Sequence, residues 1–242
     1  MIGSSLEDRL GSPRAKLALV ALLLLFLAIT AALLGHPATR QQARPWLLFE
    51  NSPVELLTFA FFLLGGLAGL RLALGAWRAQ LGALTVAFYV VYSIGLVFIA
   101  GEEVAWGQWF FHWQTPEEWR AVNVQGETTL HNVPGLNDVL PVLHILFAAG
   151  ALVGIAARRV RPLRWLATPG VLAPWFALVL VHQLLELATA IAFRGSVQHK
   201  LFERTSEVVE MYLAIAAWLY VFLNARRLRR EASLDDPGSR AA

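Results

Sequence analysis

The chain of 242 residues has no cysteine, and only 15% of its residues are charged. Without cysteine, disulfide bonds and thiolate chemistry are excluded. The scarcity of charge, together with 57% hydrophobic residues, is not typical of an ordinary soluble domain. No glycine-rich phosphate loop, serine triad or nucleic-acid-reading motif is visible in the sequence, so we expect no nucleic-acid partner. The net charge of +3 is better explained by membrane topology.

Six apolar runs match the roughly 20 residues that a helix needs to cross a bilayer core of about 30 Å. They predict an all-α, polytopic bundle of six transmembrane helices in one domain, residues 17–224. The first run exceeds the apolar region of about 7–15 residues in a cleaved signal peptide, which favours a retained helix. Ser52, followed by proline and by glutamate three places on, predicts the start of the second helix, after a loop that contains His36. The six runs are 17–34, 53–74, 81–100, 139–157, 166–193 and 208–223.

The basic residues are unevenly distributed between the two sides of this bundle. If the N-terminal segment 1–16 is cytoplasmic, most Lys and Arg residues lie on the cytoplasmic side, including the arginines of 158–164 and of the tail, 225–242. This agrees with the positive-inside rule. It predicts a multi-pass protein of the cell membrane, with both termini cytoplasmic and the segment 101–137 outside. We expect the tail to be basic and then disordered.

The segment 101–137 is the longest polar interval of the chain. It opens with Glu102 and Glu103, and acids at a helix C-terminus oppose the macrodipole, so they need a partner such as Arg120 or a bound cation. Threonine, proline and two glutamates predict a short surface helix at 116–122. The aromatic side chains of this segment are more typical of a belt at the membrane interface than of a surface that stacks on a substrate. The polar residues expected to line a site here are Trp106, Gln108, Asn123, Gln125 and Asn132.

Three histidine–glutamate pairs have a spacing of four residues, which on a helix brings both side chains to one patch. The pairs are Glu127 with His131, His182 with Glu186, and His199 with Glu203. Oxygen and imidazole ligands without thiolate suit zinc, iron or manganese, so we expect a divalent metal. The spacing of His199, Glu203, Glu207 and Glu210 places them on one helical face. Glu210 would lie deepest in the membrane, and we expect it to face the interior of the bundle because exposure of a carboxylate to lipid is costly. His144 is either a further site residue or a structural histidine. The predicted metal ligands are His131, His182, His199, Glu203, Glu207 and Glu210, and the predicted catalytic residues are Glu102, Glu103, Glu127 and Glu186.

The motif GEEVAWGQ, followed by NVQGETTLHN and later by HKLFERTSEVVEM, resembles a family of uncharacterised bacterial polytopic membrane proteins. Members carry E-E-x-S-W-G-Q ahead of N-x-Q-x-E-x-x-x-H-N. Ala105 stands where the family has serine, which argues against that serine as a nucleophile. A more distant similarity is to membrane hydrolases of the alkaline-ceramidase type, which also group histidines and acids inside a helical bundle, although shared architecture does not carry function. The first resemblance implies a core formed by Glu102, Glu103, Trp106, Gly107, Gln108, Asn123, Gln125, Glu127, His131 and Asn132.

Three functions fit these patterns. The sequence favours a metal-dependent hydrolase or transferase that acts on a lipid or lipid-linked substrate in the outer leaflet. In that hypothesis a metal-bound water is the nucleophile and Glu102 or Glu103 is the general base. A proton- or cation-coupled transporter or channel is the second hypothesis, and it predicts a polar path to the opposite face. The third is a non-catalytic accessory subunit of a membrane complex, which docks through the segment 101–137.

Overall fold

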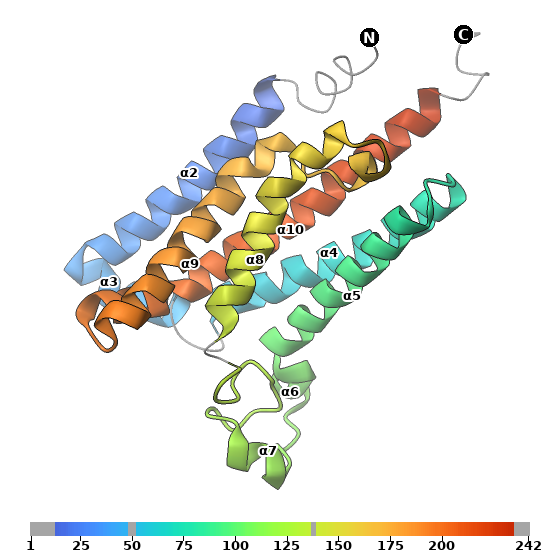
Figure 1. The fold of residues 1–242 in the computed structure, drawn as a ribbon. Helices are drawn as coiled ribbons and strands as arrows, with labels where there is room; N and C mark the ends of the chain where they lie inside the picture. The colour runs from blue at the N-terminus through green and yellow to red at the C-terminus, as the bar shows by residue number, and fades with distance from the viewer. Residues whose placement is uncertain (1–12, 48–51, 137–138, 235–242) are drawn as a thin grey trace.

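The computed structural model describes residues 13–47, 52–136 and 139–234 of the chain. The described residues form helices and turns without a strand, and six helices are long and apolar enough to cross a membrane (Figure 1). The predicted all-helical fold with six long apolar helices is therefore confirmed. These helices are α2 (Pro13–Gly35), α4 (Pro53–Arg78), α5 (Ala83–Glu103), α8 (Leu140–Gly154), α9 (Ala173–Phe193) and α10 (Val197–Leu234).

Helix α10 is the centre of the bundle. Of its membrane-length window 72% is buried, against 6% for α2 and 6% for the window that contains α8. Helix α10 packs on α4 and α9, α4 packs on α5, and α9 packs on α8. The packed helices therefore follow the order α8–α9–α10–α4–α5, with α5 and α8 at the two ends.

Small residues bring α4 and α5 into close contact. A Cβ atom built on Gly69 would lie 2.2 Å from Ser93 Oγ, and one on Gly66 would lie 2.6 Å from Val97 Cγ2. Glycine is therefore needed at both positions for the two backbones to approach this closely, as in many helix pairs of membrane proteins.

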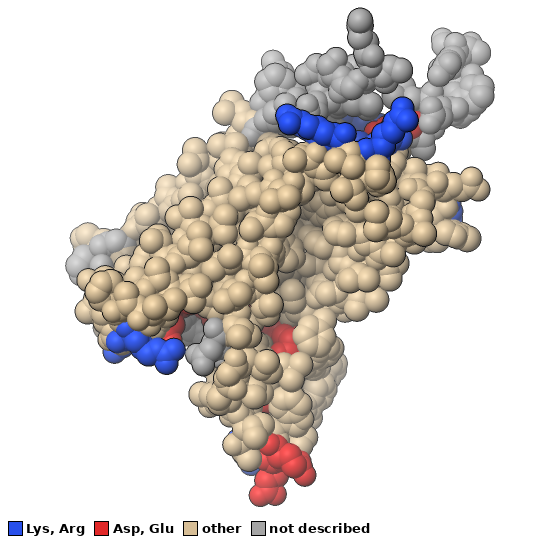
Figure 2. All heavy atoms as spheres, in the orientation of Figure 1, with Lys and Arg blue, Asp and Glu red and all other residues tan. Residues whose placement is uncertain are grey.

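The two ends of the bundle differ in charge. The arginine end carries η3 (Ala156–Arg159), η4 (Arg161–Leu166), the first turn of α2 and the last turns of α10 (Figure 1). The loop end carries residues 101–136, with α6 (Gln108–Phe111) and α7 (Glu117–Val122). In Figure 2 basic side chains gather along the upper end and acidic ones at the lower tip, and a second basic group lies at the lower left, by the turn between α9 and α10. Helix α7 confirms the predicted surface helix.

Helix boundaries follow the sequence prediction at some ends and not at others. Ser52 caps α4, and its hydroxyl accepts a hydrogen bond from the backbone N–H of Glu55 at 3.4 Å, as the sequence predicts. The loop expected around His36 is wrong in part, because residues from Pro37 to Leu47 form helix α3. Proline suits the first turn of a helix, where its missing N–H has no partner in any case.

Helix α10 is much longer than the apolar run that predicts it. The helix begins at Val197 and continues to Leu234 through the arginines that follow Leu223. A short turn, η5 (Gly170–Leu172), precedes α9, so the helix begins at Ala173, several residues after the start of the apolar run 166–193. The segment 1–12 and the tail from 235, expected to be polar or disordered, lie outside the described residues.

Candidate functional site

The carboxylate of Glu102 ties the loop end to the last turn of α5. Its Oε2 accepts hydrogen bonds from the backbone N–H groups of Leu130 at 2.6 Å and His131 at 3.1 Å. Its Oε1 accepts the indole N–H of Trp106 at 2.6 Å. The imidazole Nδ1 of His131 lies 3.3 Å from Oε2. Protein donors therefore surround this carboxylate. The sequence suggested Arg120 or a bound cation as its partner, but backbone and indole N–H groups take that role.

Glu127 and His131 do not share a helical patch, because residues 123–136 form turns rather than a helix. The carboxylate of Glu127 accepts the indole N–H of Trp109 at 3.4 Å, whereas the imidazole of His131 lies against Glu102. The sequence argument from their spacing is wrong at this point, since a spacing of four residues brings side chains together only on a helix.

The asparagines of the segment fix its turns. The Asn123 side chain donates to the backbone oxygen of Thr129 at 2.8 Å and accepts from the backbone N–H groups of Gln125 at 3.0 Å and Glu127 at 3.1 Å. Asn132 donates to Thr129 Oγ1 at 3.1 Å and to Gln125 Oε1. Asn123, Thr129 and Asn132 are buried. The predicted site-lining residues Asn123, Gln125 and Asn132 thus hold the loop in shape.

The chain leaves α5 through backbone conformations that L residues rarely adopt. Ala105, Trp106 and Gly107 have φ values of 46°, 55° and 92°. The indole of Trp106 covers Gly101, where a Cβ atom would meet it at 2.8 Å. Such strain persists only where the surroundings hold it, and here the Trp106 N–H bond to Glu102 does so.

A second polar group, the His/Glu network, lies between α8, α9 and α10. The Gln183 amide donates to Ser206 Oγ at 3.0 Å, and the Ser206 hydroxyl donates to Glu210 Oε1 at 3.3 Å. His144 Nδ1 is 4.0 Å from the same Glu210 oxygen. The network consists of His144, His182, Gln183, Glu186, Thr205, Ser206 and Glu210.

The hydrogen bonds around His182 fit the tautomer that carries its proton on Nε2. The Thr205 hydroxyl donates to the backbone oxygen of Leu201 at 2.9 Å, so Thr205 Oγ1 accepts from the Nε2–H group of His182 at 2.8 Å. Nδ1 of His182 then carries a lone pair and lies 3.9 Å from Glu186 Oε2. Both atoms are buried and have no hydrogen-bond partner in the described structure. In this tautomer a donor that bridges the two atoms, such as a water molecule, would satisfy both.

Carboxyl groups on α4, α5, α9 and α10 lie near one another at the loop end of the network. Glu103 at the end of α5 lies within electrostatic range of Glu55 on α4 and of Glu207 and Glu210 on α10. Glu186 lies within the same range of Glu210. The loop end of the bundle therefore concentrates carboxyl groups next to the two histidines of the network.

The six predicted metal ligands do not form one group. His131 is held by Glu102, and His182 belongs to the network. His199 Nδ1 is buried without a hydrogen-bond partner among the residues described, and Glu203 is exposed. In the part of the chain that the structure covers, no three His, Asp or Glu side chains are arranged to hold a metal ion. The divalent metal itself stays a prediction.

The uncharged members of the network were missed by sequence reasoning. Gln183 follows His182 on α9, and Thr205 and Ser206 lie about one turn before Glu210 on α10. The sequence does contain a signal for these residues. An amide or hydroxyl side chain within an apolar helix usually forms a hydrogen bond to a neighbouring helix.

Comparison with protein-family models, with curated proteins and with solved structures finds no match to this chain. The resemblance to the bacterial membrane protein family therefore stays a prediction.

Proposed function

We propose that this protein is a membrane enzyme, a hydrolase or transferase, that acts on a lipid or lipid-linked substrate. The observation that carries the proposal is the pair of buried acceptors, His182 Nδ1 and Glu186 Oε2, at a separation of 3.9 Å. A water molecule or a substrate hydroxyl that donates to this pair satisfies both atoms. Transfer of its proton to the imidazole or the carboxylate is general base catalysis.

The rest of the network supports a second proton-transfer group. Gln183 and Ser206 form a chain of hydrogen bonds that ends on Glu210, and this chain orients the Glu210 carboxylate. His144 Nδ1 lies 4.0 Å from that carboxylate. We assign to Glu210 and His144 the return of a proton to the leaving group, and to Gln183 and Ser206 the positioning of Glu210.

The arrangement of the helices supports access from the bilayer. Helices α5 and α8 lie at the ends of the packed series, and the ring of Tyr92 meets the ring of Phe147 at 5.9 Å between them. On the face shown in Figure 2 the surface is hollowed between α8 and α5, and acidic side chains are visible at the lower end of this hollow. A lateral opening suits a substrate that diffuses within the membrane plane.

Transport is less well supported by the same helices. From Met211 to Leu219 helix α10 is apolar except for Tyr212, whose hydroxyl is hydrogen-bonded to Thr30 at 2.9 Å. The described residues of α10 therefore offer no continuous polar path from Glu210 to the arginine end. A site that opens at one end fits an enzyme of one leaflet better than a channel.

The proposal is tested with purified protein in nanodiscs of a polar lipid extract, with mass spectrometry of the lipids before and after incubation. His182→Gln keeps a donor for Thr205 but removes the base, and Glu186→Gln removes the carboxylate. We expect each variant to lose roughly 10²- to 10⁴-fold in lipid turnover. His36→Asn is the matched control, because the His36 side chain is exposed and, among the described contacts, accepts only the backbone N–H of Ala38. Unchanged turnover in both variants overturns the assignment, and elemental analysis of the same sample tests the predicted metal.

A further inference from the structure

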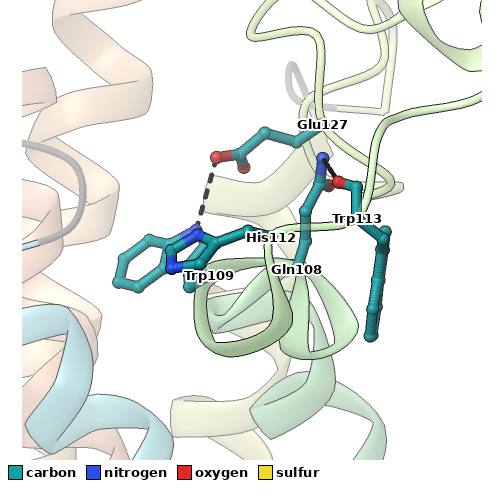
Figure 3. A pocket seen from close by; sticks show the side chains of 5 residues that line it. All are labelled: Gln108, Trp109, His112, Trp113 and Glu127. Atoms are coloured by element: carbon teal, nitrogen blue, oxygen red, sulfur yellow. Dashed lines mark hydrogen bonds between the residues drawn. The ribbon is translucent and has the colours of Figure 1, made fainter.

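The loop end contains a pocket that shares no residue with the His/Glu network. Its volume is about 490 Å³, and it opens to the surface. Figure 3 shows Trp109 and Trp113 on opposite sides of the pocket, with Gln108 between them, His112 drawn over Trp109 and Glu127 above Trp109. Two indoles, a carboxylate and an imidazole therefore surround one space.

The walls of this pocket are held by neighbouring groups. The Gln108 amide donates to Thr115 Oγ1 at 2.7 Å and to the backbone oxygen of Trp113 at 3.2 Å, and its oxygen accepts two bonds from Thr128. The Trp113 ring stacks on Phe111 with centroids 5.6 Å apart. A Cβ atom at Gly107 would approach both rings to 3.2–3.3 Å. The aromatic surfaces are thus preorganised before a ligand arrives.

The charge around the pocket favours a cationic ligand. Residues 101–136 contain five glutamates, a single arginine and no lysine. That arginine, Arg120, is not among the lining residues and donates to the backbone oxygen of Thr115 at 3.3 Å. Glu127 is a lining residue, and it accepts the N–H of Trp109 at 3.4 Å. A cation in the pocket would therefore meet a carboxylate and two indole rings, and no lysine or arginine is among the lining residues.

The pocket lies next to a membrane-length helix. The ring of Phe110 on α6 contacts the ring of Phe59, near the start of α4, at a centroid distance of 6.0 Å. Helix α6 supplies Gln108 and Trp109, and it therefore lies beside the first turns of α4. This is the level at which a membrane-spanning α4 would meet the lipid headgroups.

We infer that this pocket binds a methylated ammonium group, as in choline, through the faces of Trp109 and Trp113 and the charge of Glu127. Aromatic rings bind quaternary ammonium groups because the negative face of the ring attracts a poorly hydrated cation. A sugar would need many hydrogen-bonding partners, whereas the amide of Gln108 is fully used by the protein. The inference goes beyond the proposed catalysis and does not depend on it.

The test uses protein labelled with 5-fluorotryptophan in nanodiscs of phosphatidylglycerol, which has no ammonium group. Choline and tetramethylammonium are titrated, and the fluorine resonances of Trp109 and Trp113 are assigned from single Trp→Phe variants. We expect both resonances to shift saturably. The neutral isostere of choline, 3,3-dimethylbutan-1-ol, should bind at least about tenfold more weakly, since it keeps the shape and loses the charge.

Variants separate the pocket from general effects on folding. Glu127→Gln and Trp109→Leu should each weaken choline binding about tenfold, whereas Trp113→Phe keeps an aromatic face and should stay within about threefold. Trp77→Leu is the control, because Trp77 is an exposed tryptophan near the end of α4. Equal affinity for the isostere, saturable binding of glucose instead of choline, or no shift in folded protein each overturns the inference.

The source of the ammonium group is resolved by changing the lipid. Nanodiscs of phosphatidylcholine should compete with free choline if the ligand is a lipid headgroup, and should leave its affinity unchanged if the ligand is soluble. Lipid turnover by His182→Gln and choline binding are separate readouts, so failure of one proposal does not imply failure of the other.

Discussion

The carboxylate of Glu102 anchors the loop end to the last turn of α5. Glu102 is the next-to-last residue of α5, where the unpaired carbonyls of a helix repel negative charge. The backbone N–H groups of Leu130 and His131 and the indole N–H of Trp106 compensate for this repulsion. Hydrogen bonds to an ionised carboxylate are about twice as strong as those between neutral groups, so one side chain can order a long segment.

Glu102→Gln tests this role. The amide cannot accept at both of its polar atoms, so either Trp106 or the pair Leu130 and His131 loses its acceptor. Because Glu102 is only 6% exposed, we expect the free energy of unfolding to fall by about 1.5–3 kcal/mol for the lost charged acceptor. Hydrogen exchange of residues 123–136 should accelerate. Glu118→Gln is the control, since Glu118 is exposed on α7. Equal protection of the segment in both variants contradicts the role.

The histidine–glutamate pairs show how far residue spacing predicts a site. His182 and Glu186 lie on α9, and their side chains come within 3.9 Å of each other. Glu127 and His131 have the same spacing, but the side chain of Asn123 folds their segment into turns. Sequence spacing predicts contact only where the backbone is helical, and hydrogen bonds from side chains to backbone decide that locally.

At the scale of elements, the contact between α4 and α5 depends on residues without side chains. Gly65, Gly66 and Gly69 are buried on α4, and each faces α5 or α10. Close packing replaces hydrophobic driving force between helices in lipid, so added side-chain volume at these positions matters more than a change in polarity.

Gly66→Ala is expected to destabilise this helix pair. The added Cβ atom would lie 2.6 Å from Val97 Cγ2 and 3.0 Å from the backbone oxygen of Ser93. Overpacking of this kind costs roughly 1–3 kcal/mol. Gly95→Ala is the matched control on α5, because a Cβ atom there meets nothing within 4 Å. Alanine should be neutral or stabilise α5 by up to about 1 kcal/mol at that position. Thermal unfolding midpoints in detergent compare the two, and equal midpoints would contradict the packing argument.

Apolar length predicted the six membrane-length helices, and it could not predict helices that polar residues extend. Helix α10 continues through its arginines because Arg227 pairs with Glu231 at 3.2 Å and packs over the ring of Trp165 at 5.1 Å. Helix α3 contains Pro45 and has few apolar residues, yet it packs beside α2 and α4. Tertiary contacts of this kind override a local preference for loops.

At the scale of the whole molecule, the arginine end is closed by hydrogen bonds to backbone oxygens. Tyr89 donates to Trp165 at 2.6 Å, Tyr220 to Leu166 at 2.8 Å and Arg227 to Arg164 at 2.8 Å. The loop end instead holds the network and the pocket. The groups that carry both proposals therefore lie at one end of the bundle, and the orientation of the bundle would decide which side of a membrane that end faces.

The orientation is measurable because the chain has no cysteine of its own. Gln114→Cys places a thiol on an exposed residue of the loop end, and Ala156→Cys places one on an exposed residue of the arginine end. From the excess of arginine at the second end, we expect a membrane-impermeant maleimide to label Gln114→Cys in intact cells and Ala156→Cys only after permeabilisation. The unmodified chain should stay unlabelled. The reverse pattern would contradict the predicted topology and would place the His/Glu network on the cytoplasmic side.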